Sequence, residues 1–247
     1  MKITSVNNEL VKNTAKLQQR KYRDESGLFL LEGDKCIEEA VSSDIEIEHL
    51  FVLEGYNAFS EMDRIETTEA ILSKISTTSS APKAVAVAKQ RKQIWSDNFK
   101  KVVLLEDIKD AGNLGTILRT SCAFDIDAVI LYGDTVDLYN PKCVRSSVGN
   151  LWKVPVFSTS DFSWLKDKFD NFERIATLPK DSNTIYLKNY VPNSKTLIMF
   201  GTEATGLSPE LKEFATKNLT IEMSDKVESL NLSISVGVVL YRLNHLS

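Results

Sequence analysis

The sequence lacks the features of an exported, membrane-bound or disulfide-linked protein. Its 247 residues include three cysteines, Cys36, Cys122 and Cys143, which show no CxxC spacing. This pattern fits reduced thiols better than a disulfide framework or a zinc site. No apolar run approaches the roughly 20 residues that a membrane-spanning helix needs, so we expect no membrane segment. The first residues, MKITSVNNELVKN, lack the apolar stretch of a secretory signal, and we expect a cytoplasmic protein.

Other absences exclude particular kinds of site. The two histidines, His49 and His245, are too few and too far apart for a zinc site or a Ser–His dyad, so we expect no metal. No GxGxxG sequence follows a predicted strand, which argues against a dinucleotide cofactor. The turn FGTEATGLSPE (200–210) superficially resembles a phosphate-binding P-loop, but Leu207 stands where the lysine is needed. This argues against nucleoside triphosphate hydrolysis.

Charge is unevenly distributed along the chain. The formal net charge is -4 at pH 7, which argues mildly against a protein that coats nucleic acid indiscriminately. Residues 1–23 and 83–101 are nevertheless rich in Lys and Arg, with Glu9 and Asp97 as their respective acids. Acidic residues concentrate in 32–69. An acidic protein with a basic face is therefore possible.

The hydrophobic pattern predicts two α/β domains, 1–95 and 96–247, joined by a polar, basic linker over 89–100. In the first domain it predicts strands 28–32, 49–54 and 84–88 and helices 7–22, 34–42 and 68–76. From Lys101 onward, short apolar strands alternate with helices, which is typical of a parallel sheet covered on both faces. The last predicted helix spans about 230–243.

Three strand-to-helix segments of the second domain carry candidate site residues. In 104–124, Asn113 is placed to cap a helix that carries Arg119, although a routine cap and a solvent-facing arginine are an equal alternative. In 199–210, a glycine-rich turn with the acid Glu203 suits close approach of backbone to a ligand, but alone it favours a plain turn. In 221–243, Ser229 and Asn231 are natural capping residues.

Taken together, the three segments resemble the three signature motifs of the SpoU (TrmH-like) family of RNA 2′-O-ribose methyltransferases. The first motif is matched by Asn113, Gly115, Arg119-Thr120 and Ala123-Phe124, the second by FGTEATGLSPE, and the third by Ile221, Met223 and ESLNLSIS (228–235). The segment 145–156 resembles the connecting helix and strand of that family. The first domain resembles, more weakly, a ribosomal-protein-like substrate-binding domain, through LLEGDKCIEEA (30–40) and SAPKAVAVA (80–88).

The resemblance implies an α/β SPOUT domain with a deep trefoil knot, preceded by a small α/β RNA-binding domain. It implies a homodimer with the active site near the subunit interface, and transfer of a methyl group from S-adenosylmethionine to a ribose 2′-hydroxyl. The implied catalytic residues are Arg119, Asn113, Glu203, Ser229 and Asn231. The implied cofactor-binding residues are Phe200, Gly201, Thr202, Gly206, Ile221, Met223 and Leu230.

The expected substrate is structured RNA, and the first domain favours ribosomal RNA over transfer RNA. Lys12, Lys16 and Arg20 recur every four residues on the predicted helix 7–22 and form one basic stripe. Such a stripe is commonly a solvated face; the family context favours RNA contact here. Arg145 is a further candidate RNA contact, and Tyr22 or Phe29 is a candidate for stacking on a base or a core residue. Two alternatives stay open: a transfer-RNA methyltransferase, and a non-catalytic RNA-binding assembly factor that keeps the fold.

Overall fold

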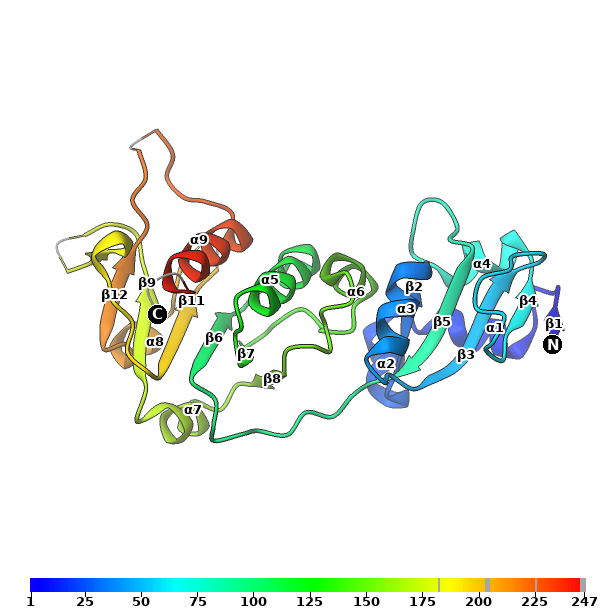
Figure 1. Ribbon diagram of the computed structural model, residues 1–247, viewed down its shortest axis with the longest axis horizontal. Helices are drawn as coiled ribbons and strands as arrows, with labels where there is room; N and C mark the ends of the chain where they lie inside the picture. Colours follow the sequence, from blue (N-terminus) through cyan, green and yellow to red (C-terminus); the bar gives the residue numbers. More distant parts are fainter. Residues whose placement is uncertain (182, 203–204, 225, 245–247) are drawn as a thin grey trace. The chain divides into compact units, whose positions relative to one another are not determined.

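The computed structural model describes residues 1–181, 183–202, 205–224 and 226–244, and the chain divides into two compact units (Figure 1). Unit 1 comprises Met1–Lys92 and Asp137–Lys153, and unit 2 comprises Gln93–Val136 and Val154–Ser247. The segment Asp137–Lys153 therefore packs with the first unit, although it lies far along the chain. Among the helices that these residues form, none is long and apolar enough to cross a membrane.

Unit 1 is built on a mixed five-stranded sheet in the order β1-β4-β3-β5-β2. Strand β5 pairs antiparallel with β2 and β3, whereas β4 pairs parallel with β3 and β1. The strands are β1 (Lys2–Ile3), β2 (Leu28–Glu32), β3 (Ile47–Leu53), β4 (Ile65–Thr67) and β5 (Ala84–Lys89). The helices are α1 (Glu9–Lys16), α2 (Arg20–Ser26), α3 (Asp34–Ser42), α4 (Glu69–Ile75) and α6 (Pro141–Ser147).

The single helix predicted over 7–22 is wrong, because the chain forms α1 and α2 with a break between them. Leu17 is buried in the core of unit 1. The side-chain amide of Gln18 donates to the carbonyl oxygens of Lys74 (2.9 Å) and Ser76 (3.1 Å). These contacts, which are distant in sequence, hold the break, and helical periodicity alone could not reveal them. Lys12 and Lys16 therefore lie on α1, whereas Arg20 begins α2.

Among the described residues, three ion pairs join the segment Asp137–Lys153 to the N-terminal part of unit 1, and two of them involve a deeply buried side chain. The guanidinium of Arg23, which is 1% exposed, donates from Nε to Asp137 Oδ2 at 2.6 Å. The guanidinium of Arg145 is paired with the carboxylate of Glu32, whose side chain is 1% exposed. Buried charges are retained at such low exposure only when they are paired.

Unit 2 contains a seven-stranded sheet in the order β10-β12-β9-β11-β6-β7-β8, and every pair in it is parallel. The strands are β6 (Lys101–Glu106), β7 (Ala128–Tyr132), β8 (Val156–Thr159), β9 (Glu173–Thr177), β10 (Ile185–Tyr186), β11 (Thr196–Phe200) and β12 (Lys217–Thr220). The helices are α5 (Ala111–Ala123), α7 (Phe162–Phe169), α8 (Pro209–Phe214) and α9 (Leu232–Asn244), with a 3-10 turn η1 (Leu187–Asn189). The predicted α/β fold with a parallel sheet is confirmed.

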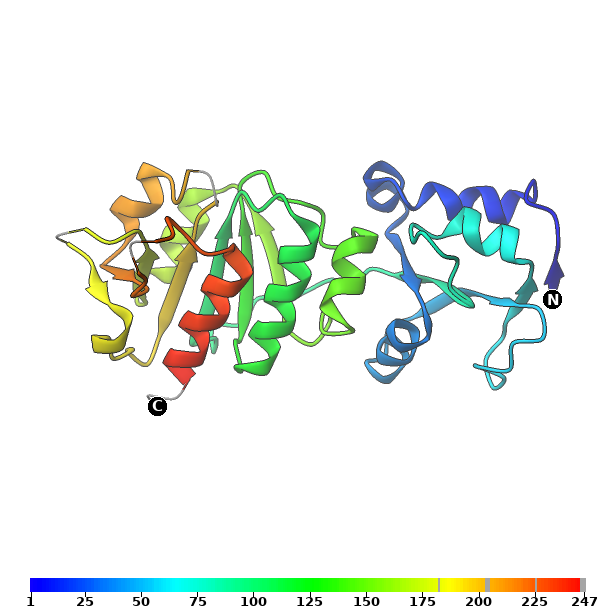
Figure 2. The same ribbon diagram turned by 90° about the horizontal axis from the view of Figure 1, so that it is seen from above.

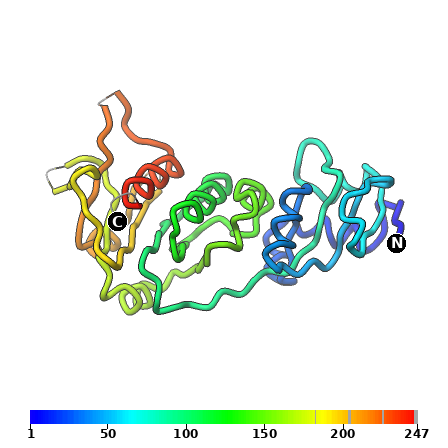
Figure 3. Tube along the Cα trace, viewed as in Figure 1, coloured from blue at the N-terminus to red at the C-terminus, as the bar shows by residue number. Residues whose placement is uncertain are grey.

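Helices cover both faces of this sheet. Alternate residues of β6, Val102 and Leu104, pack in one core with Leu165 of α7 and Leu211 of α8. Figure 2 shows α5 and α9 side by side along the sheet, and the two helices are in contact. Figure 3 follows the chain from β12 to α9, which is its last element. Open parallel sheets bind ligands at the carboxyl ends of their strands, so a ligand site is expected at that edge of this sheet.

The predicted linker is partly a core element. The ring of Trp95 makes edge-to-face contacts with Phe99 (5.1 Å between centroids), Trp164 (5.2 Å) and Phe169 (5.6 Å). Aromatic pairs in this geometry add to the stabilisation from burial. Trp95 therefore anchors the segment that enters unit 2.

Candidate functional site

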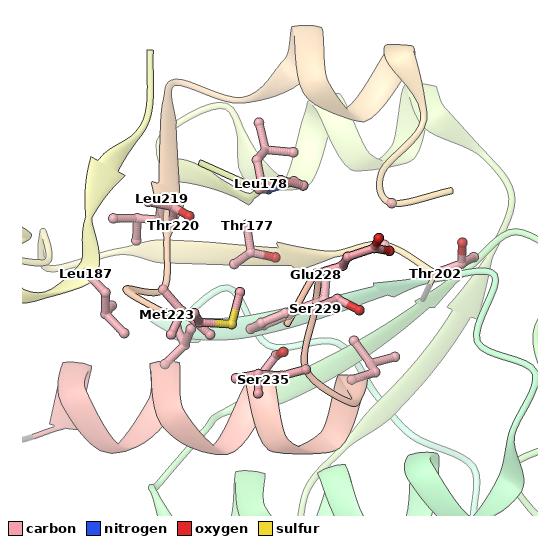
Figure 4. A pocket seen from close by; sticks show the side chains of 18 of the residues that line it. Thr177, Leu178, Leu187, Thr202, Leu219, Thr220, Met223, Glu228, Ser229 and Ser235 are labelled. Atoms are coloured by element: carbon pink, nitrogen blue, oxygen red, sulfur yellow. The ribbon is translucent and has the colours of Figure 1, made fainter. Parts of the chain in front are cut away.

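A cavity of about 350 Å³ opens at the carboxyl ends of the strands, where β9, β11 and β12 lead into loops (Figure 4). All seven residues predicted to bind the cofactor line it: Phe200, Gly201, Thr202, Gly206, Ile221, Met223 and Leu230. Ser229, predicted as a catalytic residue, lines it too. The cavity lies within the size range of small-ligand pockets.

The turn after β11 is closed on itself by backbone contacts. Thr202 N donates to Gly206 O at 3.2 Å, and Gly206 N donates to Thr202 O at 3.0 Å. A Cβ atom at Gly201 would lie 2.0 Å from the carbonyl carbon of Gly206 and 2.2 Å from Leu207 N. Only glycine fits there, because backbone atoms cannot move aside like the end of a flexible side chain. Glu203, predicted as a catalytic residue, lies outside the described residues.

The start of α8 is held by two side-chain oxygen acceptors from different parts of the chain, one a hydroxyl and one a carboxylate. Ser208 Oγ accepts from Leu211 N at 3.3 Å and so caps the helix. The buried carboxylate of Glu106, at the end of β6, accepts from Ser208 N at 2.7 Å. The turn that borders the cavity is thereby tied to the neighbouring strand.

The helix of the first motif begins about one turn earlier than the sequence predicts. Helix α5 starts at Ala111, and the side chain of Asp110 caps it by accepting from Asn113 N at 2.8 Å. The prediction that Asn113 caps this helix is therefore wrong, because the acid three residues before it reaches the same backbone donors. The side chain of Asn113 is used elsewhere: its Oδ1 accepts from Asn231 Nδ2 at 3.1 Å.

Asn231 links the first and third motifs. Besides its bond to Asn113, its Oδ1 accepts from Ser233 N (3.0 Å) and Ser233 Oγ (2.6 Å) at the start of α9. The predicted capping role of Asn231 is confirmed. Residues 118 positions apart in the sequence thus meet beside the cavity wall formed by Ser229 and Leu230.

Arg119 lies apart from the cavity. It is exposed on α5 and is not among the residues that line the pocket. Within the described part of the chain, no hydrogen bond or ion pair engages its guanidinium. Helices α5 and α9 pack closely behind it, since a Cβ on Gly237 would meet Thr120 Cγ2 at an ordinary 3.9 Å. Arg119 is thus an exposed cation on α5.

Two features of the cavity suit a ligand with an apolar part and charged groups. Its walls combine aliphatic and aromatic side chains with hydroxyl groups, and its charged side chains among the described residues are Lys212 and Glu228. Figure 4 shows Glu228, Ser229, Met223 and Ser235 around the opening beside α9. In the described residues, no group of three His, Cys, Asp or Glu side chains could hold a metal ion.

Some lining residues were missed by sequence reasoning. Thr177, Leu178 and Pro179 lie at the carboxyl end of β9, a position that the rule for parallel sheets could have flagged. Leu187 and Lys212 also line the cavity, and neither carries a sequence signal. Their positions depend on how β10 and α8 fold back beside β12.

The candidate RNA-binding residues lie in unit 1 and differ in their surroundings. Lys12, Lys16 and Arg20 are each next to a polar group on their own helix: Glu9 (2.8 Å), Asn13 (2.9 Å) and Asp24 (3.5 Å). Arg145 instead contacts the buried Glu32 and donates from Nη1 to Thr77 Oγ1 at 2.6 Å. This arrangement gives Arg145 a structural role, and its predicted RNA contact stays a prediction.

The two aromatic candidates in unit 1 also differ. Phe29 is fully buried and packs on Tyr139, with 4.7 Å between ring centroids, so it is a core residue. The ring of Tyr22 is partly exposed and has Lys16 Nζ and Lys21 Nζ each 5.8 Å from its centroid. Of the two, Tyr22 is available for stacking.

Comparison with sequence models of known families shows to which family the chain belongs. The sequence model of the SpoU rRNA Methylase family matches residues 100–241. The chain belongs to this family. A second model, the MRM3-like substrate binding domain, matches residues 8–86. Together the two matches extend over most of both units.

Relatives of this SpoU-family chain match it from end to end. It is 32% identical to an uncharacterized tRNA/rRNA methyltransferase of Synechocystis sp., over 97% of this chain and 92% of that protein. It is 27% identical to the 23S rRNA (guanosine(2553)-2′-O)-methyltransferase RlmP of Bacillus subtilis, over 98% of each. A crystal structure of an RNA 2′-O ribose methyltransferase superposes with a TM-score of 0.84 and 30% identity, covering 98% of this chain and 97% of that one.

Proposed function

We propose that this protein is an S-adenosylmethionine-dependent enzyme that methylates a ribose 2′-hydroxyl in ribosomal RNA. The observation that carries the proposal is the single cavity wall built from the second and third SpoU motifs, with the Asn113–Asn231 hydrogen bond joining the first motif to it. The full-length relatives named for 2′-O-methylation of 23S rRNA support ribosomal RNA as the substrate.

The residues of the cavity fit S-adenosylmethionine. Apolar side chains such as Phe200, Ile221 and Leu230 can enclose a flat adenine, and glycine at position 201 lets the turn that borders the cavity close on itself. Lys212 and Glu228 offer one cation and one anion to the zwitterionic amino-acid part. When bound there, S-adenosylmethionine supplies an electrophilic methyl group on a sulfonium, which needs no metal.

The protein has to position the 2′-oxygen for attack on the methyl carbon, with S-adenosylhomocysteine as the leaving group, and to stabilise negative charge as the hydroxyl gives its proton to water. We assign the second task to Arg119, whose guanidinium donates hydrogen bonds to the 2′-oxygen or to the adjacent phosphate. An arginine stays protonated, so it acts by charge rather than as a base. Asn113 and Asn231, fixed by their mutual hydrogen bond, and Ser229 orient the ribose. Glu203 stays a candidate for orienting the site.

We further propose that two copies of the chain form a homodimer through α9. Ile234 (53% exposed), Val238 (38%) and Tyr241 (57%) lie at i, i+4 and i+7 and form an apolar stripe on the surface beside α5. A second copy that covers this stripe would bring its own helix α5, with Arg119, toward the neighbouring cavity. Light scattering on the purified protein tests this: Tyr241→Glu should give monomers, and a monomeric parent protein would overturn the proposal.

We propose that the two predicted domains, 1–95 and 96–247, divide the work between RNA binding and methyl transfer. Lys12 and Lys16 lie on α1 and Arg20 begins α2, and Lys16 and Lys21 lie over the ring of Tyr22; these basic side chains of unit 1 suit RNA. The trefoil knot and the cytoplasmic location expected from the sequence stay predictions.

The test is transfer of labelled methyl from S-adenosylmethionine to separate pools of ribosomal and transfer RNA. The products are digested with alkali, which cannot cleave beside a 2′-O-methyl group. Label in an alkali-resistant dinucleotide from ribosomal RNA is the expected result. Label in a dinucleotide from transfer RNA alone would make transfer RNA the substrate instead. If no methyl group is transferred and calorimetry detects no cofactor binding, the protein is a non-catalytic RNA-binding protein.

A further inference from the structure

A second cavity, of about 320 Å³, adjoins the cofactor cavity at the edge of the sheet in unit 2. The two cavities share part of their walls, namely Pro179, Thr220, Ile221, Met223 and Glu228. Thr220, Met223 and Glu228 of this shared wall are labelled in Figure 4. The second cavity therefore lies next to the proposed methyl-donor cavity.

The feature that distinguishes this cavity is Tyr186. It lies on the edge strand β10, which pairs in parallel with β12 so that Tyr186 stands opposite Thr220. The ring is partly exposed, with Lys180 Nζ 5.7 Å and Lys188 Nζ 5.2 Å from its centroid. Pairing of β10 with β12 fixes the backbone at Tyr186, and its side chain lines the cavity.

The charges around the ring decide what kind of ligand it suits. Lys188 Nζ is 3.2 Å from the carboxylate of Glu222, and Glu228 also lines the cavity. Among the described residues that line the cavity, two lysines are thus balanced by two glutamates, which does not favour a general phosphate site. Both ammonium groups lie over the ring, so its face already attracts a positive or flat partner. A nucleobase suits this place, because it can stack on the ring in place of an ammonium group, which then lies near the phosphate of that nucleotide.

We propose that Tyr186 is a stacking platform for one unpaired base of the substrate RNA, close to the nucleotide that is methylated. The inference rests on the proposed function, because the shared wall places this platform next to the methyl-donor cavity. It adds a contact in the methyltransferase unit to the basic surface of unit 1. Single-stranded bases splayed from a structured RNA are commonly recognised by such stacking.

The experiment compares Tyr186→Ala and Tyr186→Phe in the full-length protein. We expect Tyr186→Ala to raise the KM for ribosomal RNA by about 10-fold or more, since stacking on an aromatic ring contributes that much per base. Tyr186→Phe keeps the ring and should change KM by less than about twofold. Calorimetry with S-adenosylhomocysteine should give the same affinity for both variants and the parent protein.

Lys180→Met and Lys166→Met form a matched pair of controls. Lys166 Nζ also lies over an aromatic ring, 4.5 Å from the centroid of Phe162, but it does not line the cavity. Lys180→Met should weaken RNA binding measured by filter retention, whereas Lys166→Met should not. This pair keeps the proposal testable even if Tyr186→Ala fails to fold.

Three outcomes would overturn the proposal. An unchanged RNA KM in Tyr186→Ala would show that nothing stacks there. A parallel loss of S-adenosylhomocysteine affinity would make Tyr186 part of the cofactor cavity. Equal effects of Lys180→Met and Lys166→Met on RNA binding would mean that Lys180 contributes only positive charge, as any surface lysine does. Absence of cofactor binding and methyl transfer in the parent protein is a separate result, which overturns the proposed function itself.

Discussion

The tight turn at Gly201 makes a quantitative prediction for Gly201→Ala. The added methyl group would sit 2.0 Å from the carbonyl carbon of Gly206, closer than any real contact, and would press on backbone. The turn has to open, which breaks the two hydrogen bonds between Thr202 and Gly206 (3.2 and 3.0 Å). At about 1 kcal/mol for each bond, opening costs about 2 kcal/mol, or about 30-fold in the affinity of a ligand that needs the closed turn.

Calorimetric titration with S-adenosylhomocysteine measures this loss. The matched control is Gly237→Ala on α9, where the new Cβ would lie an ordinary 3.9 Å from Thr120 Cγ2. Alanine favours a helix interior over glycine by about 1 kcal/mol, so this variant should bind normally and unfold no more easily than the parent. If Gly201→Ala bound the ligand as tightly as the parent protein, the turn would not be part of the binding site and the reasoning would be refuted.

The remaining predictions concern other charged groups. Arg119→Ala should abolish methyl transfer while calorimetry finds unchanged cofactor affinity; loss of both would show a structural role instead. Arg145→Met leaves the carboxylate of Glu32 buried without its cation and should lower the free energy of unfolding by about 3 kcal/mol, measured in urea, because an unpaired buried charge is costly. Glu173 is buried, which by itself raises its pKa, but hydrogen bonds led by that from Lys217 (2.9 Å) bring the pKa below 4.5. Because the pKa of Glu173 is lower in the folded protein than in the unfolded chain, its ionised carboxylate stabilises the fold, and this stabilisation is lost as acid protonates it. The difference in thermal unfolding temperature between the parent and Glu173→Gln should therefore shrink as the pH falls below 4.5. A difference that does not depend on pH would contradict this.

Much of unit 2 could be predicted because its strands carry their own signal. Runs such as Val102–Leu105 and Ala128–Tyr132 are apolar on every residue, and a strand buried on both faces in a parallel sheet requires such runs. The edge strand β10 has only two residues, and its side chains are not deeply buried. It therefore gave no periodic signal, and the cavity beside Tyr186 was missed with it.

The motifs predicted the residues that line the cofactor cavity, but they did not predict the hydrogen-bond partners of the residues around it. Gly201 and Leu230 line the cavity as expected. By contrast, the cap of α5 shifted to Asp110, because several polar residues near a helix start compete for the same donors and geometry decides between them. Asn113 was thereby released for its hydrogen bond to Asn231.

The sequence by itself determined which elements form and which residue types gather at the strand ends, because local periodicity and motif chemistry are written along the chain. Only the tertiary structure decided which distant residues meet. The break at Leu17, the pairing of Arg145 with Glu32 and the return of α9 beside α5 all depend on contacts between residues far apart in sequence. The hydrophobic effect favours burial of apolar residues wherever they stand in the sequence, so the sequence alone does not show which distant residues will pair.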